Sequence, residues 1–170
     1  MFNDTDFEVL LYCASECERQ GSGEMSVYSM VNAWDFAQGT SPSGRENTKR
    51  MTSAFIEHIG QLVEPQKNSR GFRQIPIYVG NGWEYIEKAK WERVPELLTM
   101  LLESYYEGIL DEAPMHPLSK SAEDQFYFEY ENIHPFVDGN GRSGKILYNY
   151  LCGTLDNPKM PPNFWGSSNP

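Results

Sequence analysis

Twelve consecutive residues carry most of the chemical potential of this chain, running from His134 to Lys145 with the sequence HPFVDGNGRSGK. Their three glycines, Gly139, Gly141 and Gly144, stand at the entry to an apolar helix, although a glycine inside a helix costs about 1 kcal/mol relative to alanine. Glycine lets backbone N–H groups approach an anion closely, and the N-terminus of a helix adds a positive pole. The spacing therefore predicts a site for a phosphate chain.

Two cations strengthen this prediction. Arg142 and Lys145 share a face in the first turn, where the helix dipole disfavours positive charge. Two cations that converge on an already positive helix end indicate a polyanion between them. Asn149, four residues beyond Lys145, extends the same face and is placed to contact the rest of a nucleotide.

A base and a carboxylate flank the predicted anion site. His134 precedes a proline, which favours an extended backbone and projects the imidazole into the loop, where it is a candidate general base. Asp138 lies beside the same site. We expect it to bind Mg²⁺, since this ion takes one or two carboxylates together with substrate phosphates and water.

A P-loop is the competing interpretation of the glycines. Gly139 to Lys145 matches the spacing G-x-x-x-x-G-K, but Ile146 stands where a P-loop has the Ser or Thr that binds Mg²⁺. The preceding segment, Tyr130 to Phe136, is not a buried apolar strand, and no alternation of strands and helices surrounds it. The sequence therefore disfavours a P-loop.

The composition limits the class of protein. The chain has 170 residues and a net charge of −10, which fits one domain and disfavours binding to nucleic acids or anionic membranes. No apolar run approaches the roughly 18 residues of a membrane span, and the N-terminus lacks the features of a secretory signal. Three cysteines, an odd number, suit a reducing compartment. We expect a soluble, cytoplasmic protein.

Helices dominate the predicted secondary structure. Apolar residues recur at three and four positions, which predicts helices over residues 4–19, 26–38, 47–62, 94–109, 119–132 and 142–155. In the first helix, this spacing directs Phe7, Leu10, Leu11, Ala14 and Cys17 toward the core. From Phe72 to Val79, apolar and polar residues alternate instead, which predicts a short strand or hairpin. Pro76 places this strand at the edge of a sheet, because proline has no N–H to donate. The fold class is all-α with a short β-hairpin.

The twelve residues closely resemble the signature of the Fic family, H-x-F-x-[DE]-G-N-G-R-x-x-R, and depart from it only at Lys145, which replaces the last Arg. Weaker resemblances lie in the early helix around Val31–Ala37, the flap that begins at Gly71, the helix start at Val94–Leu98 and His116–Leu118. The resemblance implies a Fic catalytic domain over residues 26–156. An N-terminal helix and linker at 1–25 would precede it, and a tail at 157–170 would follow.

Fic proteins usually transfer AMP from ATP to a Ser, Thr or Tyr hydroxyl of a target protein. The resemblance implies that His134 deprotonates that hydroxyl, Asp138 binds Mg²⁺, and Lys145 meets the terminal phosphate. It also implies an anion hole and phosphate contacts formed by Gly139, Asn140, Gly141 and Arg142. The flap would bind the target by adding a strand to it. Its candidate docking residues are Phe72, Arg73, Gln74, Ile75 and Ile77.

The departure at Lys145 leaves other functions open, because Lys is a point charge and does not bind a phosphate bidentately as Arg does. The alternatives are a Fic-fold pseudoenzyme or nucleotide-binding module, or transfer of a different nucleotide or phosphate group. The phosphotransferase branch of Doc-like toxins lacks the Gly-Asn-Gly-Arg pattern and is disfavoured.

Regulation is the least defined feature of the sequence. Many Fic proteins carry an inhibitory helix with the pattern [ST]-x-x-x-E-[GN], of which this chain has no clean copy. Glu16 and Glu18 come near it without the correctly placed Ser or Thr. The hypothesis is that inhibition is absent, unusual, or supplied by a separate antitoxin-like partner.

Overall fold

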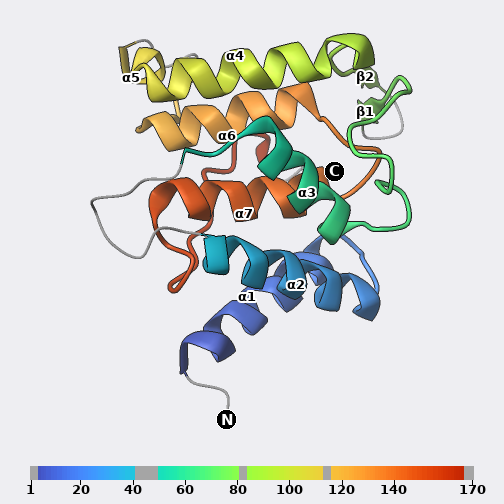
Figure 1. Ribbon diagram of the computed structural model, residues 1–170, viewed down its shortest axis with the longest axis vertical. Helices are drawn as coiled ribbons and strands as arrows, with labels where there is room; N and C mark the ends of the chain where they lie inside the picture. The colour runs from blue at the N-terminus through green and yellow to red at the C-terminus, as the bar shows by residue number, and fades with distance from the viewer. Residues whose placement is uncertain (1–3, 41–49, 81–83, 113–115, 167–170) are drawn as a thin grey trace.

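The computed structural model describes residues 4–40, 50–80, 84–112 and 116–166, and it consists mainly of helices (Figure 1). In chain order the elements are α1 Asp4–Arg19, α2 Glu24–Thr40, α3 Ser53–Val63, β1 Tyr78–Gly80, β2 Tyr85–Glu87, a 3₁₀ turn at Trp91–Arg93, α4 Val94–Tyr106, α5 Ile109–Glu112, α6 Ala122–Ile133 and α7 Asn140–Cys152. The predicted fold class, helical with a short β-hairpin, is confirmed. None of the helices in the described ranges is both long and apolar enough to cross a membrane.

Helix α7 lies at the centre of the molecule. It contacts α6, α2 and α3, and Figure 1 shows it between α6 on one side and α2 on the other. Ile146 and Leu147 on α7 are fully buried. Trp34 on α2 is also fully buried, and its indole N–H donates to the carbonyl of Leu155 at 2.9 Å. The predicted anion site at the start of α7 is therefore built on the most enclosed helix of the fold.

Local capping sets the helix boundaries. The Thr52 side chain accepts from Phe55 N–H, so α3 begins at Ser53. Of the six residues by which the prediction started earlier, 50–52 are not helical and 47–49 lie outside the described residues. Ser121 caps α6 in the same way. Gly108, at φ 76°, separates α4 from α5, where one helix was predicted. Thr52 and Ser121 therefore set where α3 and α6 begin, and Gly108 sets where α4 ends.

The predicted inward face of α1 is correct at Cys17, which is buried, but wrong at its first three apolar residues. Phe7 is 61% exposed, and Leu10 and Leu11 are exposed as well, whereas Cys13 and Glu16 are buried. At about 100° per residue, Glu16 lies on the face of α1 opposite Phe7, so the two cannot both point into the protein. The fold buries Glu16 because its carboxylate forms an ion pair with Lys145 on α7.

The predicted strand over Phe72–Val79 is also displaced. Strand β1 begins at Tyr78 and pairs antiparallel with β2, with Val79 opposite Ile86. The first two residues of the predicted strand are drawn inward instead: the ring of Phe72 packs on Phe136 at 5.5 Å between centroids, and Arg73 is buried. The hairpin therefore starts six residues later than the sequence suggested.

Gly144 permits the close packing of α7 on α6. A Cβ atom at this position would lie 2.7 Å from Oε1 of Glu131 and 3.1 Å from ring atoms of Tyr127 and Tyr130. Overpacking of this kind costs about 1–3 kcal/mol, more than the roughly 1 kcal/mol that alanine gains over glycine in a helix. We expect Gly144→Ala to lower the free energy of unfolding, measured by chemical denaturation.

The matched control is Gly39→Ala near the end of α2, where a Cβ would meet nothing within 4 Å. This variant should leave the protein unchanged or make it more stable, because only the helix propensity changes. Equal stabilisation by both substitutions would contradict the packing role of Gly144.

Candidate active site

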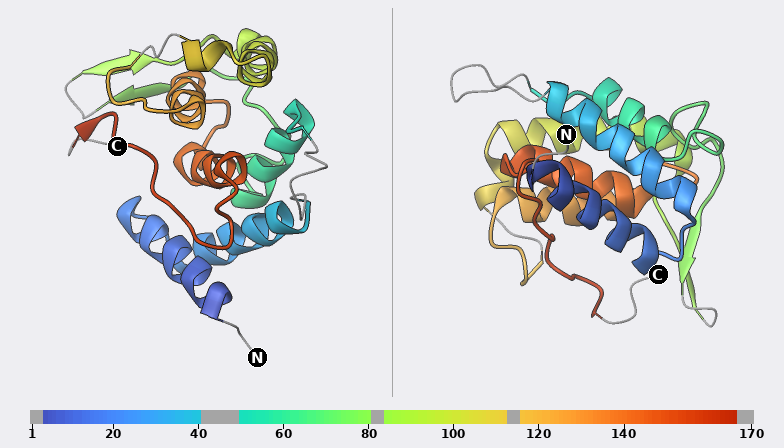
Figure 2. Two further views of the ribbon diagram at one scale, coloured as in Figure 1. Left: turned by 90° about the vertical axis from the view of Figure 1, so that its left-hand side faces the viewer. Right: turned by 90° about the horizontal axis from the view of Figure 1, so that it is seen from below.

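A cleft of about 750 Å³ lies beside the N-terminal end of α7. Its walls come from the loop before α7, the end of α6, the hairpin, the end of α1 and the C-terminal segment, whose last described turn returns toward the hairpin (Figure 2). The lining includes seven of the predicted site residues, among them His134, Asp138, Gly139, Asn140 and Lys145. Gly141, predicted for the anion hole, and Ile77, predicted for the flap, line it as well.

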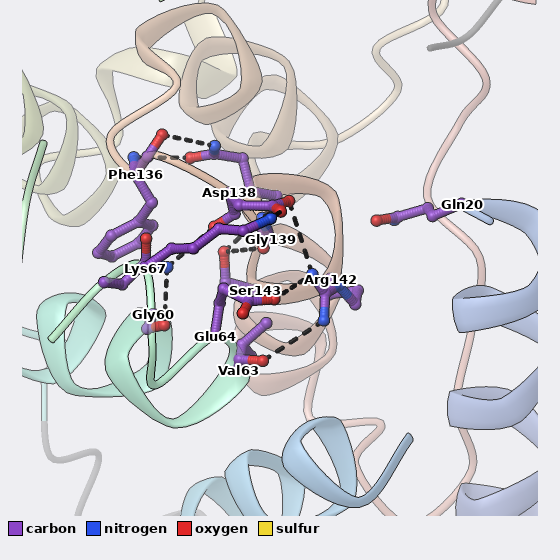
Figure 3. A network of polar contacts seen from close by, with 12 residues as sticks. Gln20, Gly60, Val63, Glu64, Lys67, Phe136, Asp138, Gly139, Arg142 and Ser143 are labelled. Atoms are coloured by element: carbon purple, nitrogen blue, oxygen red, sulfur yellow. Dashed lines mark hydrogen bonds and ion pairs between the residues drawn. The ribbon is translucent and has the colours of Figure 1, made fainter. Parts of the chain in front are cut away.

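The loop before α7 is closed by the side chain of Asn140. Its Oδ1 accepts from Phe136 N–H at 2.8 Å, and its Nδ2 donates to the Phe136 carbonyl at 2.9 Å (Figure 3). Gly139 takes the left-handed conformation, at φ 75°, which lets the chain turn directly into the helix. The N–H groups in the first turn of α7 have no carbonyl partners within the helix. They lie at the end of α7 that borders the cleft. Asn140 thus shapes the anion site through the backbone it orders.

Arg142 braces this loop against α3. Its guanidinium is buried, with Nη2 3.0 Å from Oε2 of Glu64 and Nη1 3.4 Å from the carbonyl of Val63 (Figure 3). Nη2 also lies 3.6 Å from Oδ1 of Asp138. Arg142 is absent from the cleft lining, so its observed contacts support the loop, and the predicted contact with phosphate stays a prediction.

Asp138 stands at the rim of the cleft with its side chain 40% exposed. It pairs with the ammonium group of Lys67 and accepts from Gly139 N–H at 2.6 Å. Partial burial acts to raise the pKa of this carboxyl, but Lys67 and the Gly139 N–H outweigh it and hold the pKa below its usual value. Asp138 is therefore ionised at neutral pH.

This carboxylate suits Mg²⁺ only in part. The described residues contain no group of three or more His, Cys, Asp or Glu side chains that could hold a metal ion. A single accessible carboxylate beside an anion site fits Mg²⁺ that takes its remaining ligands from phosphates and water.

His134 adopts a left-handed conformation, with φ 54° and ψ 64°, where an extended one was expected. The reason is that this residue ends α6, and its N–H donates to the carbonyl of Tyr130 at 2.9 Å. The turn places Nδ1 3.3 Å from the carbonyl of Glu131. Burial, and then the charge of Lys88, lower the pKa of His134 to about 4. The imidazole is therefore neutral at pH 7 and able to accept a proton.

Arg73 ties the base of the flap to this turn. Its Nε donates to the His134 carbonyl at 2.7 Å, and its other nitrogens bond the carbonyls of Ile75, Ala89 and Ile133. Arg73 and Phe72 were both predicted to dock the target. Arg73 is buried and Phe72 packs inward, so neither side chain is available for docking. Of the predicted flap residues, Gln74 and Ile75 are exposed.

Lys145 forms a buried ion pair with Glu16. Their Nζ and Oε1 atoms are 2.7 Å apart, and each side chain is 2% exposed. Arg19 also donates to Glu16, at 2.7 Å, and the Gln20 amide bonds the same carboxylate. Gln20 points from the end of α1 toward the loop (Figure 3). Burial acts to raise the pKa of Glu16, but Arg19 and Lys145 lower it below its usual value.

Asn149, the predicted nucleotide contact, is fully buried and does not line the cleft. It anchors the C-terminal segment instead: Oδ1 accepts from Lys159 N–H at 2.7 Å, and Nδ2 donates to the Lys159 carbonyl at 3.0 Å. That segment carries Trp165 to the cleft wall, where its ring stacks on Phe128 at 5.9 Å between centroids.

Sequence reasoning gave no role in the site to several residues that line the cleft or touch its charged groups. They are Glu16, Arg19, Gln20, Lys67, Tyr127, Lys88, Glu131 and Trp165. Most are separated from the glycine-rich loop by tens of residues. The one signal in the sequence was that Glu16 comes near the inhibitory pattern of the family without matching it.

Comparisons with known proteins agree with this architecture. The model of a family described as "Fic/DOC family" matches residues 45–152. A crystal structure of a Fic domain containing signaling protein from Bacteroides thetaiotaomicron superposes with a TM-score of 0.60 at 20% identity, covering 74% of this chain and 46% of that one. A Fic family protein from Desulfovibrio desulfuricans superposes with a TM-score of 0.55 at 17% identity, covering 89% and 49%. The chain thus spans about half the length of these structures. A search of curated proteins found no match.

Proposed function

The chain belongs to the Fic/DOC family, and from this premise we propose that it is a protein adenylyltransferase that moves AMP from ATP to a Ser, Thr or Tyr hydroxyl of a target protein. The observation that carries the proposal is the neutral imidazole of His134 in the same cleft as the N-terminal end of α7. A proton acceptor and an anion site side by side are what transfer of a phosphoryl-type group to a hydroxyl requires.

In the proposed reaction, Nε2 of His134 takes the proton of the target hydroxyl, and the resulting oxygen attacks the α-phosphorus of ATP. The bond to the β-phosphate oxygen breaks, and pyrophosphate leaves. The first-turn N–H groups of α7 stabilise the charge on the phosphate oxygens, while the cleft positions both reactants. Asp138 would hold Mg²⁺, which neutralises phosphate charge when bound.

The hairpin is the proposed docking site for the target. In the described part of the chain, β1 and β2 form a two-stranded sheet, so a target segment can pair with an outer edge. Three large side chains on this hairpin, Tyr78, Tyr85 and Ile86, are exposed. All three also line the cleft, which would bring a docked segment to His134.

We further propose that α1 restrains the site. The carboxylate of Glu16 is bonded to the Lys145 ammonium, the group predicted to meet the terminal phosphate. A triphosphate that binds Lys145 must displace or share this ion pair. Restraint would then be built into the chain, and a separate antitoxin-like inhibitor stays a prediction.

A nucleotide-binding module without transfer activity is the second candidate. It is favoured by the pairing of both predicted ligand groups with protein charges, Lys145 with Glu16 and Asp138 with Lys67. Such a protein would bind ATP and leave it intact.

The test compares ATP labelled at the α-phosphate with ATP labelled at the γ-phosphate, each incubated with the protein, a cell lysate and Mg²⁺. Adenylyl transfer predicts protein-bound label from α-labelled ATP alone, and loss of that label when the metal is chelated. Label from γ-labelled ATP would instead establish phosphotransfer. Bound nucleotide with no protein label would favour the module.

A further inference from the structure

Helix α6 carries a buried carboxylate to which the proposed reaction gives no role. Glu131 lies three residues before His134, lines the cleft and is 9% exposed. Its Oε2 is 3.9 Å from Nδ1 of His134. Its Oε1 has no hydrogen-bond partner among the described residues.

The fold keeps this carboxylate in place at a cost. An unpartnered buried oxygen loses its hydration, which typically costs about 1–3 kcal/mol and more for a charged group. The fold also leaves room for it, since a side chain on Gly144 would come within 2.7 Å of Oε1. Groups retained against such a cost are enriched in functional sites.

The charges around Glu131 come from four elements. Lys145 on α7 and Lys88 beside the hairpin favour its ionised form, as does Arg19 on α1, whereas Glu16 on α1 opposes it. The other titratable groups that interact with it are His134 at the end of α6 and the tyrosines Tyr127 and Tyr130 on that helix.

We propose that Glu131 is a positioning residue that keeps the His134 proton on Nδ1 and balances the positive charge that forms when Nε2 takes the proton of the target hydroxyl. The geometry supports both effects. Nδ1 lies 3.3 Å from the Glu131 carbonyl, an acceptor that requires a proton on Nδ1 and leaves Nε2 free as the base. The carboxylate on the same residue faces Nδ1, where the imidazolium charge is shared. The second effect rests on the proposed transfer reaction, whereas the first does not.

A charge on Glu131 would compensate for the low basicity of His134. Burial and Lys88 lower the pKa of His134 to about 4, which keeps it neutral but makes it a weak base. A nearby negative charge offsets this weakness when the proton arrives. Burial raises the pKa of Glu131 to about 7, so its carboxylate form accumulates as pH rises through neutrality. The transferred proton stays on Nε2 until it returns to water, and Glu131 need not accept it.

The kinetic test uses Glu131→Gln, which keeps the shape of the side chain and removes its charge. Loss of a charged partner behind a catalytic histidine should lower kcat by about 10- to 100-fold, a modest part of the effect seen in catalytic triads. The dissociation constant for ATP should change less than about twofold, because Glu131 repels rather than binds phosphate. The rise of kcat with pH near 7 should disappear, which a purely structural role would not cause.

The matched control is Glu129→Gln on the same helix. Glu129 bonds Gln125 and does not line the cleft, so kcat and its pH profile should stay unchanged. Thermal unfolding of both variants checks that they are folded. A Glu131→Gln protein with wild-type kcat and pH profile would overturn the proposal.

An NMR titration of ¹⁵N-labelled protein tests the proposal without any transfer assay. The His134 nitrogens should report a proton on Nδ1 at pH 7, together with a step near pH 7 that is lost in Glu131→Gln. A proton on Nε2, or a step that persists in the variant, would refute the positioning role. If the labelled-ATP experiment fails while these signals appear, the proposed function is wrong and the Glu131–His134 arrangement stands.

Discussion

Glu16→Gln is expected to lower the free energy of unfolding by about 3 kcal/mol, toward the lower end of what breaking a buried ion pair costs. The substitution leaves the Lys145 ammonium buried, with its partner carboxylate replaced by a neutral amide. The amide oxygen still accepts one hydrogen bond, which limits the loss. Urea denaturation followed by circular dichroism measures the change.

Two further variants isolate the cause. Glu18→Gln makes the same change on an exposed position of α1 and should shift the unfolding free energy by less than about 0.5 kcal/mol. Adding Lys145→Met to Glu16→Gln removes the unpaired charge and should recover part of the lost stability. If Glu16→Gln and Glu18→Gln unfold alike, the buried pair contributes nothing.

The same variant reports on restraint of the site. Because Lys145 is freed from Glu16, Mg²⁺–ATP should raise the melting temperature of Glu16→Gln more than that of the wild type, as expected for tighter binding to the folded state. Under the proposed function, its transfer rate should also rise. A smaller ATP-induced shift than in the wild type would argue against restraint by α1.

His134→Asn is expected to reduce AMP transfer by about 10²- to 10⁴-fold, the usual contribution of a general base. Asparagine suits the position because it tolerates the left-handed backbone found there, at φ 54°, but its side chain does not take up a proton near neutral pH. Binding of ATP should remain within about twofold, since the anion site is formed by the loop and α7. Transfer is measured with α-labelled ATP and binding by calorimetry.

The control for this variant is His58→Ala on α3, an exposed histidine whose ring packs on Phe36 away from the cleft. It should transfer AMP at the wild-type rate. Transfer that survives in His134→Asn would remove His134 from the role of base.

The helical fold was predictable because apolar residues recur at helical spacing, as at Met30, Ala33 and Trp34 on α2. Local caps also helped, since Ser121 caps α6 and Gly139 caps α7. The glycine-rich loop was predictable for a similar reason, since Gly139 and the cations Arg142 and Lys145 lie within two helical turns. These are local patterns, and local patterns act through the nearest few residues.

The rest depended on contacts between distant segments. The face of α1 was not predictable from local spacing, because apolar residues lie on more than one side of the helix. The buried side includes Glu16, whose partner Lys145 is more than 120 positions away. Arg73 was predicted to be an exposed flap residue. Its side chain instead donates hydrogen bonds to four backbone carbonyls from three segments. The left-handed turn at His134 overrode the usual preference before proline because ending α6 required it.

The clamp formed by Arg73 has a consequence for which residue of a target would be modified. Because one guanidinium bonds both the carbonyl of His134 and that of Ile75 at the base of the flap, the docking edge and the base keep a fixed separation. Side chains of a docked strand alternate between two faces, and a shift by one residue exchanges them. Under the proposed function, the register of the docked strand therefore selects the modified residue. The fixed distance between the docking edge and His134 allows only one hydroxyl of the paired segment to reach the base.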